Sequence, residues 1–117
     1  MREQLILQTD RVYIIQRTPQ GVTCTVNGNP LPLRLDLWNH SPTGFEFGYG
    51  GSGPAQLALA ILADCCGEDA AVAYHQAFKW AVIARIPAKG GGLTATFVRD
   101  VVAGLQSERE SQQYRNN

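Results

Sequence analysis

The stretch FEFGYGGSGPAQLALAIL, residues 45–62, decides the fold. Four glycines fall within residues 48–53, and Pro54 then precedes a run of alanine and leucine, which are strong helix formers. This pattern predicts a glycine-rich loop that leads into a helix, with Ser52 or Gly53 as the N-cap. Because alanine and leucine leave the helix almost no polar face, we expect it to be central and buried.

Two more helices are predicted on the C-terminal side. The first helix spans residues 54–66 and ends at Gly67, a residue suited to a C-terminal cap. The second spans residues 68–86, because the proline that follows disfavours helical geometry in the residue before it. A loop is expected at residues 89–92, and the third helix spans residues 97–105. Thr94 or Thr96 is predicted to cap this third helix.

Strand patterns fill the N-terminal part of the chain. Residues 11–17 are rich in β-branched and aromatic side chains, and residues 22–26 alternate in polarity, so the two are predicted to form a hairpin around the turn at 18–21. The Asn-Gly pair at 27–28 is a strong hairpin signal. We therefore expect a third strand over residues 31–37, irregular at its start because two prolines remove backbone donors.

Together these elements predict an α+β fold. It consists of a small antiparallel β-meander of three or four strands packed against two or three α-helices. A further short strand can come from residues 5–7. The domain is expected to span residues 1–105, and residues 106–117 form a polar tail or a frayed helix.

Size and charge limit the classes of function. The chain has 117 residues, which suits a single domain, and its ten basic residues balance its ten acidic residues. Non-specific nucleic-acid binding is therefore not expected, and no apolar run approaches membrane-spanning length, so we predict a cytoplasmic protein with no membrane partner. The three cysteines are expected to be reduced, buried thiols, since neither they nor the two histidines have the spacing of a metal site.

The glycine-rich loop permits a second function. Gly48, Gly50 and Gly53 match the spacing of a dinucleotide fingerprint, but helix follows helix here and the parallel strand of that motif is missing. A structural tight turn is the favoured interpretation, and we predict no cofactor. The alternative is a small-molecule, nucleotide or phosphate site formed by Gly50, Gly51, Ser52 and Gly53 at the start of the helix.

A serine hydrolase is a third, less favoured hypothesis. Ser52 lies in a sequence that resembles a nucleophile elbow, although Pro54 replaces the second glycine of that motif. His40 and Asp36 would have to serve as the base and the residue that orients it. We favour helix capping for Ser52, loop hydrogen bonds for His40 and a surface or boundary position for His75, so no catalytic residue is predicted.

The loop from residue 38 to residue 52 is the predicted partner-binding surface, because aromatic residues are enriched at the energetic centres of protein interfaces. The residues assigned to it are Trp38, His40, Phe45, Phe47 and Tyr49. Trp80 and Tyr13 are further aromatic candidates. For these two, as for Trp38, Phe47 and Tyr49, aromatic residues also fill cores, and a core position is favoured. A basic stripe is also conceivable, formed by Arg11, Arg17 and Arg34.

The run HSPTGFEFGYGGSGPAQLALAIL, residues 40–62, resembles an uncharacterised family of small prokaryotic, phage and plasmid proteins, a domain of unknown function. The turn at 26–28 and the segment 74–80 extend the resemblance, and family members often have Trp where this chain has Phe47. The resemblance implies a mobile-element origin and assigns no catalytic residues. It favours a non-catalytic protein that occludes a protein partner, such as an anti-CRISPR-like inhibitor of host defence, and it leaves homo-oligomers open.

Overall fold

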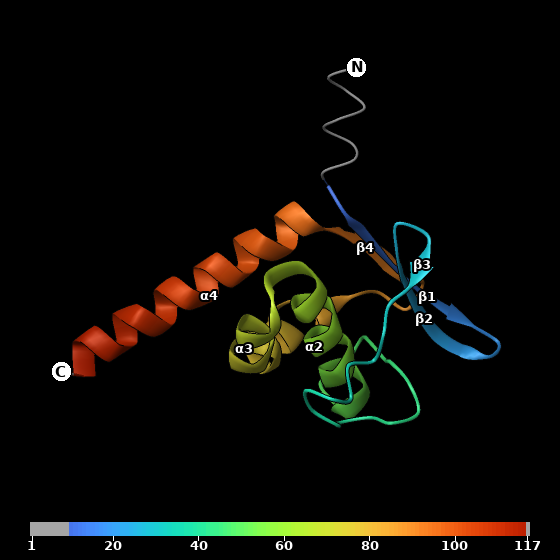
Figure 1. Cartoon of the computed structure of the whole chain (residues 1–117), viewed down its shortest axis with the longest axis horizontal. Coiled ribbons are helices and arrows are strands. Elements are labelled where there is room, and N and C mark those ends of the chain that lie inside the picture. The colour runs from blue at the N-terminus through green and yellow to red at the C-terminus, as the bar shows by residue number, and fades with distance from the viewer. Residues whose placement is uncertain (1–9, 117) are drawn as a thin grey trace, which may run out of the picture.

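Strands and helices alternate in blocks along the part of the chain that the structure, a computed structural model, describes, residues 10–116 (Figure 1). The predicted strand at 5–7 lies outside these residues. In chain order the elements are β1 (Val12–Thr18), β2 (Gly21–Val26), β3 (Asn29–Pro30), α2 (Ser52–Cys66), α3 (Glu68–Ala81), the 3-10 helix η1 (Ile83–Arg85), β4 (Gly91–Thr94) and α4 (Ala95–Asn116). The predicted α+β class is confirmed.

The sheet has four antiparallel strands in the order β3-β2-β1-β4. The predicted hairpin is present, with Tyr13 opposite Val26 and Thr18 opposite Gly21. Along β1 the side chains alternate: Tyr13 and Ile15 are fully buried, and Ile14 between them is exposed. One face of the sheet therefore packs on the helices.

The predicted third strand over 31–37 is wrong. Asn27 and Gly28 do form the expected turn, both with positive φ, but β3 ends at Pro30. The N–H of Leu31 still donates to the carbonyl of Cys24 at 2.9 Å. Beyond it a second proline has no N–H to give, and Arg34 has a φ of 59°, which is incompatible with an extended strand.

The fourth strand is β4, in a segment predicted to begin in a loop. It pairs with the free edge of β1, with Leu93 opposite Tyr13. This pairing joins residues some 80 positions apart in sequence, and a local pattern rich in glycine does not signal it. The predicted loop at 89–92 is therefore wrong from Gly91 onward.

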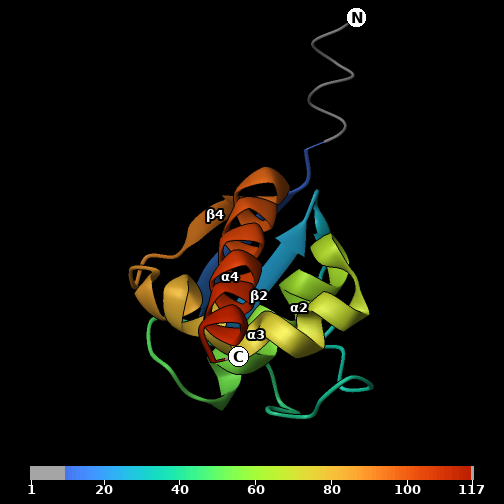
Figure 2. The same cartoon turned by 90° about the vertical axis from the view of Figure 1, so that its left-hand side faces the viewer.

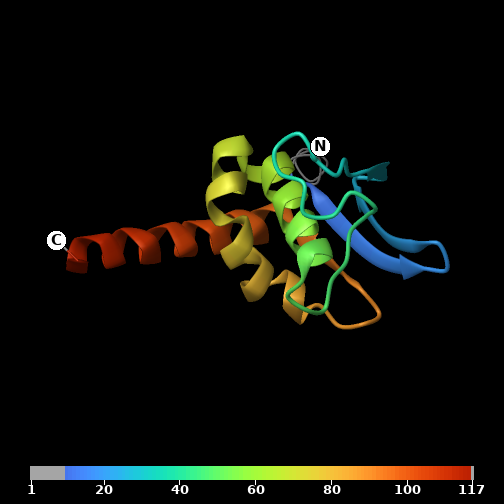
Figure 3. The same cartoon turned by 90° about the horizontal axis from the view of Figure 1, so that it is seen from below.

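Helices α2 and α3 lie on one side of the sheet, with α2 between the sheet and α3 (Figures 1 and 3). Residues 53–62 of α2 are all buried, as predicted for a central helix. Gly67 separates α2 from α3 with a φ of 95°. Two predicted boundaries are wrong: the N-cap of α2 is Gly51, without a side-chain cap, and α3 ends at Ala81 and is followed by η1.

Helix α4 crosses over the other helices and then extends beyond them (Figures 1 and 2). Thr94 caps it, since its Oγ1 accepts the N–H of Phe97 at 3.1 Å. Val98 and Val102 are buried, but residues 106–115, in the predicted tail, are helical and exposed. Across residues 10–116, every helix is too short or too polar to cross a bilayer.

Candidate functional site

The long segment between β3 and α2 is held in place by the side chain of Gln56. This residue is fully buried in α2, and its Oε1 accepts the backbone N–H groups of His40 and Ser41 at 2.8 and 3.0 Å. Its Nε2 donates to the carbonyls of Leu33 and Trp38 at 2.6 and 3.0 Å. Gln56 thus satisfies four backbone groups of a segment that has no ladder of its own. The signal in the sequence was a single uncharged polar residue within an apolar helix.

Phe45 and Phe47 lie beneath this segment and not on its surface. Their side chains are 8% and 2% exposed, and Phe45 forms a β-bridge with Val22. The guanidinium of Arg17 lies 4.8 Å from the ring centroid of Phe47. The prediction that Phe45 and Phe47 contact a partner is therefore wrong, because apolar burial makes them core residues that support the loop from below.

His40 meets His75 across the junction of this loop with α3. The two Nε2 atoms are 2.9 Å apart, and Nδ1 of His75 lies 2.9 Å from the carbonyl oxygen of Ala71. A carbonyl only accepts, so in the neutral ring Nδ1 of His75 carries the proton and its Nε2 accepts one from His40. His75 is 1% exposed, which corrects its predicted surface or boundary position.

The environment of His40 favours its neutral form. Burial lowers the pKa of His40 below its ordinary value of 6.5, and the nearby positive charges of His75 and Lys79 lower it further. Trp38 stacks on the other side, with ring centroids 5.1 Å apart and an interplanar angle of 13°. This stacking on His40 fixes the orientation of the half-exposed Trp38.

The glycines of the loop make room for aromatic rings. A Cβ on Gly50 would lie 2.0 Å from the ring of Trp80, and one on Gly51 would lie 2.5 Å from the ring of Tyr49. At Gly53 a Cβ would meet that of Glu46 at 2.6 Å. The Cβ positions of these glycines are therefore taken by other side chains, which explains why glycine is needed at each of them. A ligand site at Gly50 to Gly53 stays a prediction.

The hydrolase hypothesis has no support in the geometry. Ser52 is the first residue of α2, and Nε2 of His40 is bonded to His75. Asp36 pairs instead with Arg34, at 3.0 Å. Among the hydrogen bonds of residues 10–116, none joins Ser52 to His40 or to Asp36.

The cysteines do not form a site either. All three are free thiols, and burial raises the pKa of Cys24 to about 12. Within the described part of the chain, no three His, Cys, Asp or Glu side chains gather as metal ligands.

The arginines of the conceivable basic stripe are each paired with acids. Arg11 binds Asp64 through two nitrogens at 3.0 Å, and Arg17 binds Glu46 at 2.9 Å. Arg34 binds both Asp36 and Glu68. Each arginine of the stripe therefore has a carboxylate beside it, in a partly exposed ion pair.

What remains exposed at the junction is a group of three aromatic side chains, here named the aromatic face: Trp38, Tyr49 and Trp80. They are 47%, 52% and 59% exposed. Trp38 contacts His40 and His75 of α3, and Lys79, one helical turn after His75, lies against the Trp80 ring. Tyr49 and Trp80 lie next to the consecutive loop residues Gly51 and Gly50. Trp38 and Tyr49 belong to the predicted partner-binding residues, whereas Trp80 was an aromatic candidate outside that set.

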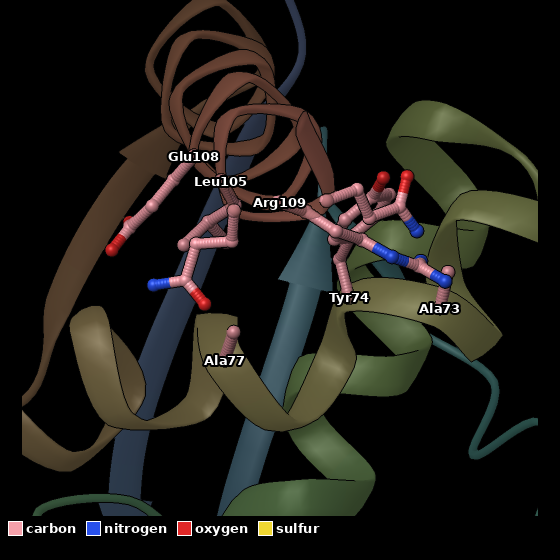
Figure 4. Close-up of a pocket in the computed structure, with 8 residues that line it drawn as sticks. Ala73, Tyr74, Ala77, Leu105, Glu108 and Arg109 are labelled. Carbon is pink, nitrogen blue, oxygen red and sulfur yellow. The ribbon is translucent and has the colours of Figure 1, made fainter. Parts of the chain in front are cut away.

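A second concave region lies between α3 and α4. Figure 4 shows Tyr74 and the small Ala77 of α3 facing Leu105, Glu108 and Arg109 of α4. The guanidinium of Arg109 lies 5.6 Å from the ring centroid of Tyr74. The groove is open, and the polar, exposed last turns of α4 form one of its walls.

Comparisons with known proteins yield one match. No curated protein and no solved structure matches this chain at a significant level. A family model covers residues 13–113, from the first buried residue of β1 to the exposed end of α4. The chain therefore belongs to the family of unknown function DUF6166.

Proposed function

We propose that the protein is a non-catalytic binding protein that occludes a protein partner through the aromatic face. The observation that carries this proposal is the exposure of Trp38, Tyr49 and Trp80, each about half exposed, at one junction. Interface hot spots are enriched in Trp and Tyr, which bury large areas when a partner covers them. Isolated exposed aromatics are ordinary, but three around one junction of a loop with a helix are typical of a recognition surface.

The aromatic face is supported by rigid neighbours. Trp38 stacks on His40, whose backbone is fixed by Gln56. Tyr49 lies over Gly51, and Trp80 lies over Gly50. Side chains that are already ordered lose less conformational entropy on binding, so more of the contact free energy remains as affinity.

The resemblance described above adds the prediction that the partner belongs to a host defence system. A protein of this size can act there only by covering a surface that the partner needs, since the proposal includes no catalytic step. His40 is a supporting member of the surface, because its ring holds Trp38 in place.

A pull-down from a bacterial lysate tests the proposal. The bait is the purified chain, compared with the double variant Tyr49→Ala/Trp80→Ala and with Tyr114→Ala as a matched control. Tyr114 is 85% exposed on α4, far along the chain from the aromatic face. We expect a partner that binds wild type and the Tyr114 variant equally, with the double variant retaining it at least about tenfold less.

Thermal unfolding of all three proteins provides the control for folding. Because the replaced side chains are exposed, the melting temperatures should agree closely. A partner retained equally by the double variant would contradict the proposal. So would a result in which no protein is retained above the level seen with the double variant.

A further inference from the structure

Lys79 is a buried cation next to the aromatic face. Only 7% of the residue is exposed, and its Nζ donates a long hydrogen bond of 3.4 Å to the carbonyl of Gly50. Nζ also lies 4.7 Å from the centroid of the Trp80 ring. Within residues 10–116 no carboxylate lies at ion-pair distance from Lys79. Buried charges in proteins are normally paired, so this ammonium is poorly compensated.

The acids on the neighbouring segments are already neutralised. Glu46 of the loop pairs with Arg17, and Glu68 at the start of α3 pairs with Arg34. His40 and His75, the other titratable groups at the junction, bring no negative charge. The last turn of α3, where Lys79 lies, contributes only the partial negative charge of its carbonyl groups. The Lys79 ammonium is therefore a positive centre beside the Trp80 ring, with no carboxylate partner among residues 10–116.

We propose that the partner places a carboxylate of Asp or Glu, flanked by apolar side chains, against the aromatic face, where it accepts a hydrogen bond from the Lys79 ammonium. The inference rests on the proposed function and specifies the chemistry of its partner. Once the partner covers this site, the charge-assisted hydrogen bond between the carboxylate and Lys79 contributes to the binding free energy, and the aromatic rings contact the apolar side chains next to the carboxylate. A phosphorylated partner fits less well, since phosphate recognition uses free arginine forks, and Arg17 and Arg34 are both paired.

A random peptide library displayed on phage supplies the probe. The library is selected on the immobilised protein, and clones that also bind Tyr49→Ala/Trp80→Ala are removed. We expect the remaining peptides to share an Asp or Glu next to apolar residues. Synthetic peptides in which that acid is replaced by Asn or Gln should bind wild type about 10- to 100-fold more weakly.

The two lysines of the chain give matched variants. Lys79→Met should weaken the binding of the acidic peptide by the same factor. It should also abolish the difference in affinity between the acidic peptide and its amide variant. Lys89→Met removes a charge from an exposed turn and should change nothing. The amide peptides on wild type test the inference even where Lys79→Met fails to fold.

The outcomes separate the two proposals. If no peptide depends on Tyr49 and Trp80, the proposed function and this inference both fail. If peptides require the aromatic face but lack an acid, or tolerate its amide, the aromatic face stands as a binding surface and the carboxylate inference is overturned. Loss of binding in Lys89→Met equal to that in Lys79→Met would also overturn it.

Discussion

The segment 31–51 and the end of α4, residues 106–115, differ both in regular secondary structure and in how they are attached to the core. The segment has almost no regular secondary structure, yet it contains the buried rings of Phe45 and Phe47 and is fastened to α2. The end of α4 is a regular helix whose side chains are all exposed, and it projects from the domain (Figure 3). Regular local structure and tertiary anchoring are therefore separate properties in this protein.

The difference arises from where each backbone finds its hydrogen bonds. A helix satisfies its own N–H and C=O groups, so the end of α4 needs no contact with the rest of the chain to do so. An irregular segment has no such ladder and depends on side chains such as Gln56. The irregular segment is thus held in one conformation by its contacts with the core beneath it, and so is any surface that it forms.

The largest expected effect comes from Gln56→Met, which keeps the side-chain length and removes its donors and acceptor. Four partly buried backbone groups lose their partner, at roughly 1 kcal/mol each, so we expect a loss of about 4 kcal/mol in the free energy of unfolding. Urea denaturation measures it. The matched change on the exposed end of α4, Gln112→Met, should stay within about 0.5 kcal/mol. Similar losses in the two variants would remove the distinction between the regions.

An intermediate effect is expected from adding one methyl group to a helical glycine next to each region: Gly53, which follows the segment 31–51, and Gly104, which precedes the end of α4. In Gly53→Ala the new Cβ would lie 2.6 Å from Cβ of Glu46 and 3.2 Å from its backbone nitrogen, so the loop must shift, at a cost of about 1–3 kcal/mol. Gly104→Ala meets nothing within 4 Å and should stabilise α4 by about 0.5–1 kcal/mol. Melting temperatures that move in opposite directions would support the comparison; two shifts of the same sign would contradict it.

The smallest effect is the pH dependence contributed by His40. Burial lowers its pKa in the folded state, so the unfolded chain binds more protons, and this part of the stability is present above about pH 6.5 and is lost as the pH falls below it. His40→Gln removes the titration. Its free energy of unfolding should therefore fall less than that of wild type between about pH 7.5 and about pH 5.5, as measured by urea denaturation. Equal changes in the two proteins would show that His40 is not the group responsible.

Most of the fold was predictable where the pattern is local. The hairpin of β1 and β2, the turn at Asn27 and Gly28 and the buried helix α2 all follow from neighbouring residues. The errors share one cause. The strand predicted at 31–37 is absent, and β4 is present where a loop was expected, because both depend on which backbone donors and edges are available at a distance.

The candidate site was predictable only in part. Trp38, His40 and Tyr49 could be selected from their aromatic rings in a glycine-rich loop, and their role stays a prediction. Phe45 and Phe47 are buried, so they are not part of the exposed surface. Trp80, which packs on Gly50, is part of it. No local pattern distinguishes an aromatic residue that supports a loop from one that is displayed on it.

By itself the sequence determined the class of fold, the position of the buried helix and the glycines that the loop requires, because these depend on residue size, polarity and backbone freedom at adjacent positions. The tertiary structure alone decided that Gln56 fastens the loop, that His40 meets His75 and that Lys79 is buried without an acid among residues 10–116. The hydrogen bonds of the first two features join residues at least 15 positions apart. Only the packed chain brings such groups within hydrogen-bonding distance or excludes water from them.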